Sequence, residues 1–197
     1  MTTTRQRKMD VTIKVDIPFS TRWIDEFIGL KCATDLLRLY PNAKEITESM
    51  AVFGAIKRFK SEYPSILGDS DVVCLCPGDG VHPRTAALAA YRTRWTCYSI
   101  DPLAKETFQA ARLWYRKAKA EDLPVADYHD KRIVILSTHS HAKLDDILRT
   151  IGSYKTLYVI ALQCCVPMEI KGHSPFKVYR DCGVFSPENE IKLWKIQ

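Results

Sequence analysis

The sequence lacks the features of a membrane-bound or exported protein. No apolar run approaches the length of about 20 residues that a helix needs to cross a bilayer. The N-terminus has a basic start at residues 5–8, but no apolar core follows it, so it does not resemble a secretory signal. Internal repeats and low-complexity segments are also absent. We therefore expect a cytoplasmic protein with no membrane partner, and a nuclear location stays open.

A paired Cys-x-x-Cys motif is absent as well, which argues against a structural zinc site. The chain has seven cysteines, an odd number, and five of them lie inside or beside apolar runs: Cys74, Cys76, Cys97, Cys164 and Cys165. We interpret these five as buried, reduced thiols that act as small hydrophobic side chains. Adjacent cysteines in or next to a strand point to opposite faces, so we expect no zinc site that combines Cys164 and Cys165 with Cys76, His139 and His141.

The composition is that of an ordinary soluble protein. The 197 residues are 46% hydrophobic and 26% charged, and this length supports one domain with a substantial core. The formal net charge is +6, and basic residues recur at 57–60, at Arg92 and Arg94, and at 112–119. Such clusters suit a polyanion such as RNA, whereas solvated helix faces would show the same pattern. RNA is therefore one candidate partner.

The N-terminal third has a helical rather than a strand pattern. We expect residues 1–10 to form a flexible basic tail and residues 11–70 to form a mainly helical extension. A short strand or an extended arm is predicted at 11–17, where apolar and polar residues alternate. Two amphipathic helices are predicted before and after Pro41, and Asn42 is placed to cap the second one. This extension is expected to pack against the rest of the chain or to cover it.

From residue 71 onward, apolar strand-like runs alternate with helical segments. Such alternation predicts a doubly wound, mostly parallel sheet covered by helices on both faces, which is a three-layer α/β/α fold. We expect residues 71–197 to form this core within one structural domain. Strands are predicted at 72–76, 95–100, 132–137 and 156–162, helices at 82–91, 104–117 and 142–151, and a closing antiparallel strand pair at 177–182 and 190–196.

The chain is organised around the segment at 71–91. A buried strand is followed by Gly78 and Gly80 and then by an alanine-rich helix. Glycines allow the backbone to approach a ligand, and the free N–H groups of a helix N-terminus bind phosphate or nucleotide groups. A turn of this kind also occurs where the chain only reverses direction.

A carboxylate at a suitable distance supports the nucleotide interpretation. Asp101 follows Gly80 by 101 − 80 = 21 residues and ends the second predicted strand of the sheet. An acidic residue about 20 positions beyond the glycine turn is placed to accept hydrogen bonds from ribose hydroxyls. The alternatives for Asp101 are a helix N-cap or a solvated loop residue.

With these residues, the chain resembles the class I (Rossmann-like) S-adenosylmethionine-dependent methyltransferases over about residues 71–196. The resemblance rests on the segment at 74–80, on Asp101, on the segment at 120–124 and on the closing antiparallel pair. It implies that the chain binds S-adenosyl-L-methionine and transfers its methyl group to an acceptor that the sequence does not define. The residues implied in cofactor binding are Cys76, Pro77, Gly78, Asp79, Gly80 and Asp101.

The chain also departs from this family. Cys74 stands where the family usually has an acidic residue, and Cys76 stands where it has glycine. A buried thiol resists ionisation and supplies no fixed negative charge, although Asp79 is placed to substitute for it. The third strand is missing from the pattern, because residues 112–119 continue a helix. The alternative hypothesis is a catalytically degenerate methyltransferase fold that serves as a binding or scaffold protein, with RNA as a candidate partner.

Candidate catalytic residues follow the strand predicted at 132–137. Residues 137–141 read Ser-Thr-His-Ser-His and belong to the carboxyl edge of the sheet, beside the first strand. His139 is a candidate general base for a hydroxyl or amine acceptor, because histidine side chains in general exchange protons close to working pH. The alternative is a pair of loop histidines that cap the helix predicted from residue 142.

Overall fold

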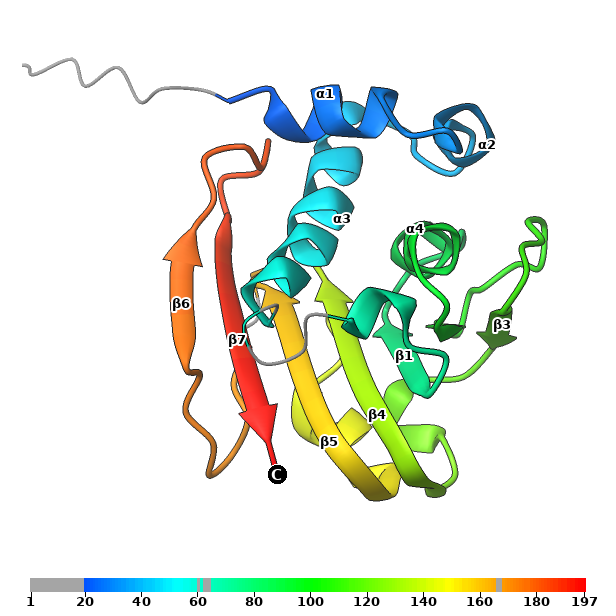
Figure 1. The fold of residues 1–197 in the computed structure, drawn as a ribbon, viewed down its shortest axis with the longest axis vertical. Coiled ribbons are helices and arrows are strands. Elements are labelled where there is room, and N and C mark those ends of the chain that lie inside the picture. The colour runs from blue at the N-terminus through cyan, green and yellow to red at the C-terminus, as the bar shows by residue number, and fades with distance from the viewer. Residues whose placement is uncertain (1–19, 60, 62–64, 166–167) are drawn as a thin grey trace, which may run out of the picture.

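The computed structural model describes residues 20–59, 61, 65–165 and 168–197. Within them, a single seven-stranded sheet has the order β3-β2-β1-β4-β5-β7-β6 (Figure 1). The predicted basic tail at 1–10 and the strand predicted at 11–17 lie outside the described residues. The strands are β1 (Val72–Pro77), β2 (Thr96–Ile100), β3 (Leu113–Arg116), β4 (Ala126–Thr138), β5 (Ile151–Leu162), β6 (Lys177–Arg180) and β7 (Glu190–Ile196).

The strand directions confirm the predicted fold class. Strands β1 to β5 pair with one another in parallel, and β7 runs antiparallel between β5 and β6. The protein is therefore a three-layer α/β fold with a mostly parallel sheet and a C-terminal antiparallel strand pair. Within the described part of the chain, no helix combines the length and apolar character needed to cross a membrane.

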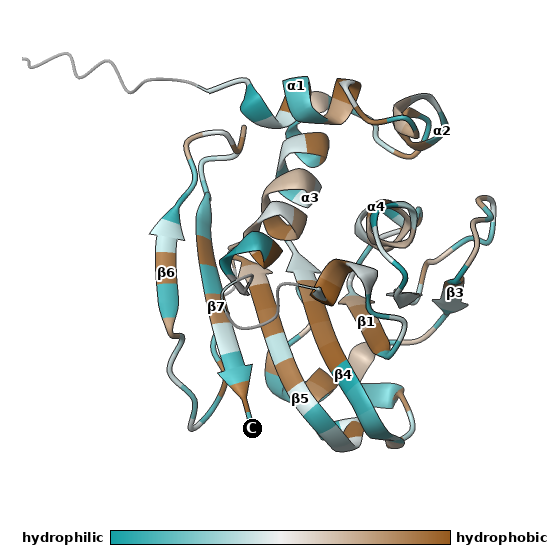
Figure 2. Cartoon of the chain, in the orientation of Figure 1, coloured by the Kyte–Doolittle hydropathy of each residue, from teal (hydrophilic) through white to brown (hydrophobic). Residues whose placement is uncertain are grey.

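The sheet is buried on both faces, which explains why its central strands are continuous apolar runs. On β1, Val73 and Leu75 contribute to the core on one face, whereas Cys74 and Cys76 contribute to the core on the other. Figure 2 shows the same apolar concentration along β1, β4 and β5 at the centre of the sheet.

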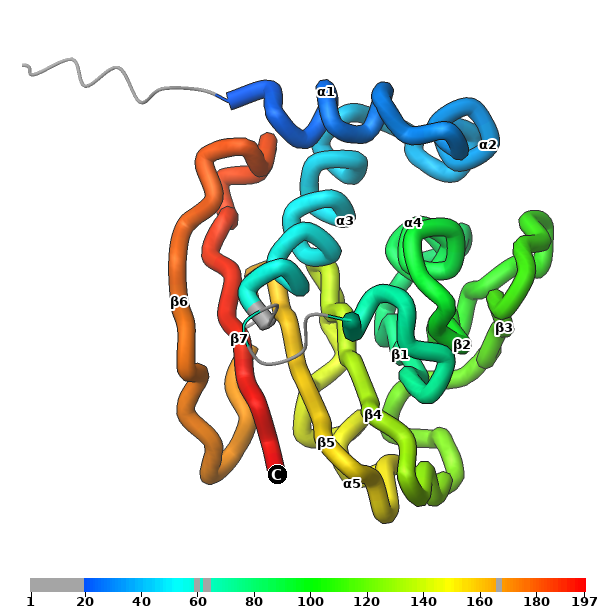
Figure 3. Tube along the Cα trace, in the orientation of Figure 1, coloured from blue at the N-terminus to red at the C-terminus, as the bar shows by residue number. Residues whose placement is uncertain are grey.

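Helices of very different length cover the two faces. The helices α3 and α4 pack on the face of Cys74, and α5 packs on the opposite face through Leu144 and Ile147. In the tube view, α3 crosses the upper ends of β4 and β5, and α1 and α2 lie above it (Figure 3). The helices are α1 (Arg22–Ile28), α2 (Ala33–Leu37), α3 (Ala43–Ala55), α4 (Arg84–Arg92) and α5 (Leu144–Arg149).

Helical structure on both sides of Pro41 was expected and is present. The first predicted helix is divided into α1 and α2, and Gly29 is the residue that ends α1. Asn42 caps α3, because its side chain accepts a hydrogen bond from the Glu45 backbone N–H at 3.1 Å. This cap fixes where α3 begins and therefore which of its side chains face the sheet.

The helix predicted at 104–117 is wrong. The structure has a loop there, followed by strand β3, which pairs in parallel with β2. Arg112 has a φ of 64°, a left-handed conformation that does not continue a right-handed helix. After it, Leu113 and Tyr115 are half-buried while Trp114 is exposed, which is the two-residue period of a strand. The third strand, which the sequence pattern did not indicate, is therefore present.

Two further boundaries differ from those predicted. Strands β4 and β5 begin at Ala126 and Ile151, well before the apolar runs at 132–137 and 156–162, and they pair along most of their length. The helix predicted at 142–151 is accordingly shorter, since α5 ends at Arg149. In these added parts, backbone hydrogen bonds pair the two strands through mostly polar residues. The apolar pattern of the sequence therefore does not indicate them.

Candidate functional site

Two cavities meet at the carboxyl ends of β1 and β4. In a doubly wound sheet, ligands bind where the strand order reverses, and here β1 connects to β2 on one side while β4 lies on the other. The larger cavity has a volume of about 390 Å³ and the smaller one a volume of about 200 Å³. Gly78 and His139 line both cavities, so the two spaces adjoin at these residues.

The larger cavity contains the carboxylate that the sequence assigned to ribose binding. Asp101 lines it together with Lys119 and Glu121. The Asp101 carboxylate accepts hydrogen bonds from the backbone N–H groups of Gly80, at 3.1 Å, and Leu103, at 2.8 Å. These bonds fix the carboxylate against the glycine turn, and each oxygen keeps a second lone pair for a ligand hydroxyl.

Gly78 sits where a side chain has no space. Its φ is 64°, and a Cβ atom at this position would lie 2.9 Å from Ser140 Cβ and still closer to the Ser140 hydroxyl. Its N–H donates to the Ile100 carbonyl at 2.7 Å, which ties the turn to the end of β2. The glycine is therefore required both by the backbone conformation and by the close approach of Ser140.

Asp79 points toward helix α4. Its carboxylate accepts hydrogen bonds from the backbone N–H groups of Thr85, at 2.9 Å, and Ala86, at 3.1 Å, and so caps the first turn of that helix. Burial raises the pKa of Asp79 to about 6, although these two hydrogen bonds act in the opposite direction. Of the five described residues predicted for the cofactor loop, Gly78 and Asp79 line a cavity, and the remaining three do not: Cys76, Pro77 and Gly80.

The two cysteines of β1 are neutral thiols in the core. Their Sγ atoms lie 3.8 Å apart, and both residues are fully buried. Burial raises the pKa of Cys76 to about 11 and holds the pKa of Cys74 well above its ordinary value. The expectation of buried thiols is confirmed for Cys74, Cys76 and Cys97. The end of β1 consequently offers no negative charge from these side chains.

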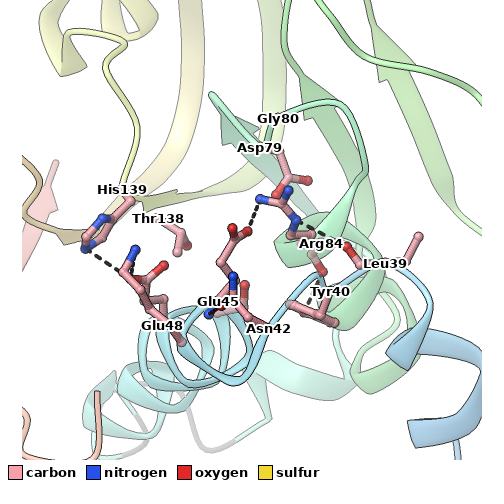
Figure 4. A network of polar contacts seen from close by, with 12 residues as sticks. Leu39, Tyr40, Asn42, Glu45, Glu48, Asp79, Gly80, Arg84, Thr138 and His139 are labelled. Atoms are coloured by element: carbon pink, nitrogen blue, oxygen red, sulfur yellow. Dashed lines mark hydrogen bonds and ion pairs between the residues drawn. The ribbon is translucent and has the colours of Figure 1, made fainter. Parts of the chain in front are cut away.

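Helix α3 forms one wall of the smaller cavity. Its residues Glu45 and Glu48 face Arg84 and His139 across the space (Figure 4). Glu45 forms an ion pair with Arg84, and Glu48, which is buried, lies 3.0 Å from the ammonium group of Lys44. The cavity is therefore lined by charged groups of both signs.

The proposed base, His139, lies beside a buried carboxylate. Its Nε2 atom is 3.5 Å from Glu48 Oε1, and it also lies 3.4 Å from the Glu188 carbonyl oxygen and 3.5 Å from the Ser186 hydroxyl. Its φ of 48° is unusual for a residue other than glycine, and such backbone strain concentrates at functional sites. His139 was expected from the sequence, whereas Glu48 was not.

The interpretation of Cys164 and Cys165 as buried thiols on opposite faces is wrong. Strand β5 ends at Leu162, so both cysteines lie beyond it, where the alternation of a strand no longer applies. Cys164 is half-buried and Cys165 is exposed, and their Sγ atoms are 3.4 Å apart. The Sγ atom of Cys165 lies 3.5 Å from Nε2 of His141.

Several basic residues of the predicted clusters contact groups of the chain itself. The guanidinium of Arg58 lies over the Tyr179 ring at 4.8 Å, and that of Arg116 lies over the Tyr98 ring at 4.9 Å. Arg112 donates to the carbonyl groups of residues 90 and 93. RNA binding by these clusters stays a prediction.

No protein-family model and no curated protein matches the sequence. Among solved structures, the chain is similar to a crystal structure of a candidate S-adenosylmethionine-dependent methyltransferase from Listeria monocytogenes, with 18% sequence identity and a TM-score of 0.33. The similarity covers 54% of this chain and 55% of that one, so this chain spans about half the length of the protein it matches. A similarity this distant does not assign an activity to the chain.

Proposed function

We propose that the protein is an S-adenosylmethionine-dependent methyltransferase that binds its cofactor in the larger cavity and the reacting end of its acceptor in the smaller one. The observation that carries the proposal is the meeting of these two cavities at Gly78 and His139. Alignment of an activated methyl group with its acceptor accounts for much of the catalysis in such transfers. Two adjoining spaces at the switch point of the sheet suit that task.

The residues of the larger cavity fit the cofactor. Asp101 and Glu121 offer carboxylates that accept hydrogen bonds from ribose hydroxyls or from an adenine amino group. The cavity volume of about 390 Å³ lies within the range of about 300–1,000 Å³ that small-molecule sites occupy. When bound, S-adenosylmethionine supplies a methyl group on a positively charged sulfur. The negative charges of these carboxylates attract that sulfur.

The smaller cavity supports an acceptor with a hydroxyl or amine group. His139 takes the acceptor proton, and the Glu48 carboxylate, 3.5 Å from Nε2, stabilises the resulting imidazolium. A volume of about 200 Å³ with charged walls admits a small polar group rather than a large apolar one. The remainder of a larger acceptor would lie outside this cavity.

Calorimetric titration with S-adenosylhomocysteine tests cofactor binding. We expect saturable binding that weakens about tenfold to a hundredfold in Asp101→Ala, because a charged hydrogen-bond acceptor is lost. Asp122→Asn is the matched control, since this exposed carboxylate lies near the larger cavity without lining it. Absence of binding heat and of a thermal shift at millimolar ligand in the wild-type protein would overturn the proposal.

A binding or scaffold protein on a degenerate methyltransferase fold is the second candidate. The observation that favours it is the pair of neutral thiols, Cys74 and Cys76, at the end of β1. This hypothesis predicts a folded protein that does not bind S-adenosylhomocysteine. It also predicts that binding to single-stranded RNA, measured by filter retention at several salt concentrations, exceeds binding to the cofactor.

A further inference from the structure

Two loops place three metal-binding side chains together at the carboxyl edge of the sheet. His141 follows β4, and Cys164 and Cys165 follow β5, which is the parallel neighbour of β4. The carboxyl ends of neighbouring parallel strands lie at the same edge, so these loops meet although they are more than 20 residues apart in sequence. One ring nitrogen of His141 and the two Sγ atoms all lie within 4.8 Å of one another.

We propose that His141, Cys164 and Cys165 bind a zinc ion through one imidazole nitrogen and two thiolate sulfurs, with the fourth coordination position open. Binding releases the two thiol protons to solvent as the Zn–S bonds form, and no oxidant or reductant is needed. The proposal does not rest on methyltransferase activity.

The observed separations match tetrahedral coordination. With Zn–S bonds of about 2.3 Å and Zn–N bonds of about 2.0 Å, tetrahedral geometry separates two sulfurs by about 3.8 Å and a sulfur from a nitrogen by about 3.5 Å. In the structure, the two Sγ atoms are 3.4 Å apart, and Cys165 Sγ is 3.5 Å from His141 Nε2. The third separation, between the Cys164 Sγ atom and the His141 ring nitrogen, lies within 4.8 Å, so rotations of the side chains would bring the three atoms around one ion.

The donor set selects the class of metal. Two sulfurs and an imidazole suit zinc, whereas magnesium and calcium require oxygen ligands. The exposure of His141 and Cys165 gives the ion a path from solvent. Three protein ligands leave a fourth position for water or another ligand, as in zinc sites that act on substrates. His141 also lines the larger cavity, so the ion would lie at the margin of the site already described.

A disulfide between the two cysteines is the competing chemistry, and chain geometry opposes it. Adjacent Cα atoms are about 3.8 Å apart across a trans peptide bond. Disulfide-bonded cysteines usually have Cα atoms about 4.4–6.8 Å apart, so a bond between neighbouring residues is strained. All seven cysteines are thiols in the structure.

Competition with a chromophoric zinc chelator tests the proposal on reduced, metal-free protein. We expect the wild-type chain to remove one zinc ion from the chelator. Cys165→Ser and His141→Ala should each weaken binding at least about a hundredfold, since even the loss of an outer-shell partner costs about tenfold to a hundredfold. Cys182→Ser is the matched control, because Cys182 is also exposed but lies outside this group. It should bind zinc like the wild-type protein.

Cobalt(II) substitution gives a second readout that depends on the ligands themselves. The wild-type complex should show a thiolate-to-cobalt charge-transfer band, which Cys164→Ser and Cys165→Ser each reduce and the double variant abolishes. Equal unfolding midpoints of the metal-free wild-type and variant proteins would establish that the variants fold. Failure of the reduced wild-type protein to retain zinc would overturn the proposal, and so would unchanged zinc binding by the double variant or binding of copper(I) alone.

Discussion

The buried carboxyl group of Asp79 predicts that the protein loses stability as the pH rises from about 4 to about 7. Burial raises its pKa from 3.8 to about 6 in the folded protein. The fold therefore favours the neutral carboxyl group, so the stabilisation is fully present below pH 3.8 and is lost as the pH rises through about 6. A pKa difference of about 2 corresponds to about 3 kcal/mol of unfolding free energy.

Urea denaturation of the wild-type protein and of Asp79→Asn at several pH values measures this effect. Asparagine stays neutral and keeps one acceptor oxygen for the first turn of α4, where Asp79 accepts from the N–H groups of Thr85 and Ala86. The difference between the two unfolding free energies cancels the titration of all other groups. We expect the wild-type protein to lose about 3 kcal/mol relative to the variant between about pH 4 and pH 8.

Asp122→Asn is the matched control, because it removes an exposed carboxylate. The difference between its unfolding free energy and that of the wild-type protein should vary by less than about 0.5 kcal/mol over the same pH range. A constant difference for Asp79→Asn would refute the reasoning, because it would mean that the Asp79 carboxyl group has the same pKa in the folded and unfolded proteins. A wild-type protein that gains stability relative to the variant as pH rises would refute it as well.

Two further predictions concern stability and are measured by urea denaturation at neutral pH. Gly78→Ala should destabilise the fold by about 2–4 kcal/mol, because a Cβ atom there overlaps Ser140. Gly172→Ala is the control and should cost about 1 kcal/mol, since that glycine has a φ of 79° but open space around it. Equal losses in the two variants would contradict the overlap with Ser140. Asp181→Ala should cost about 1–3 kcal/mol of unfolding free energy, because the buried Asp181 carboxylate accepts hydrogen bonds from Arg22 at 2.5 Å and from the backbone of the β6–β7 connection. An unchanged urea midpoint would show that this link between α1 and the β6–β7 hairpin does not stabilise the fold.

Most strands that were predicted correctly from the sequence are buried ones, because burial requires their residues to be apolar. Val72 to Cys76 is apolar because β1 is covered on both faces, so its strand character is visible in the residues alone. Strand β3 lies near the edge of the sheet, and its exposed Trp114 and half-buried neighbours give no continuous apolar run. The left-handed backbone at Arg112, which separates β3 from the preceding loop, has no glycine or proline to indicate it.

The candidate site was only partly predictable for a similar reason. The spacing between the glycine turn and Asp101 follows from the chain order of strand, turn and strand, and Gly78 of that turn lines the larger cavity together with Asp101. Glu48 comes from α3, about 30 residues before the glycine turn, and its position depends on how that helix packs on the sheet. Likewise, Cys165 lies beside His141 because the loops that follow β5 and β4 meet at one edge of the sheet, and the sequence alone does not show this pairing of loops.

The N-terminal helices, α3 above all, share their hydrophobic core with the sheet. Trp23 and Phe53 share one hydrophobic core with Cys74, Leu88 and Leu193, so the helices before residue 70 and the sheet bury the same apolar surface. We therefore propose that residues 20–70 and 71–197 fold as one structural domain. Without α3, the sheet would expose that apolar surface, and the smaller cavity would lose its acidic wall. In the function that we propose, the strand ends would hold the cofactor, and α3 would determine which acceptors fit the smaller cavity.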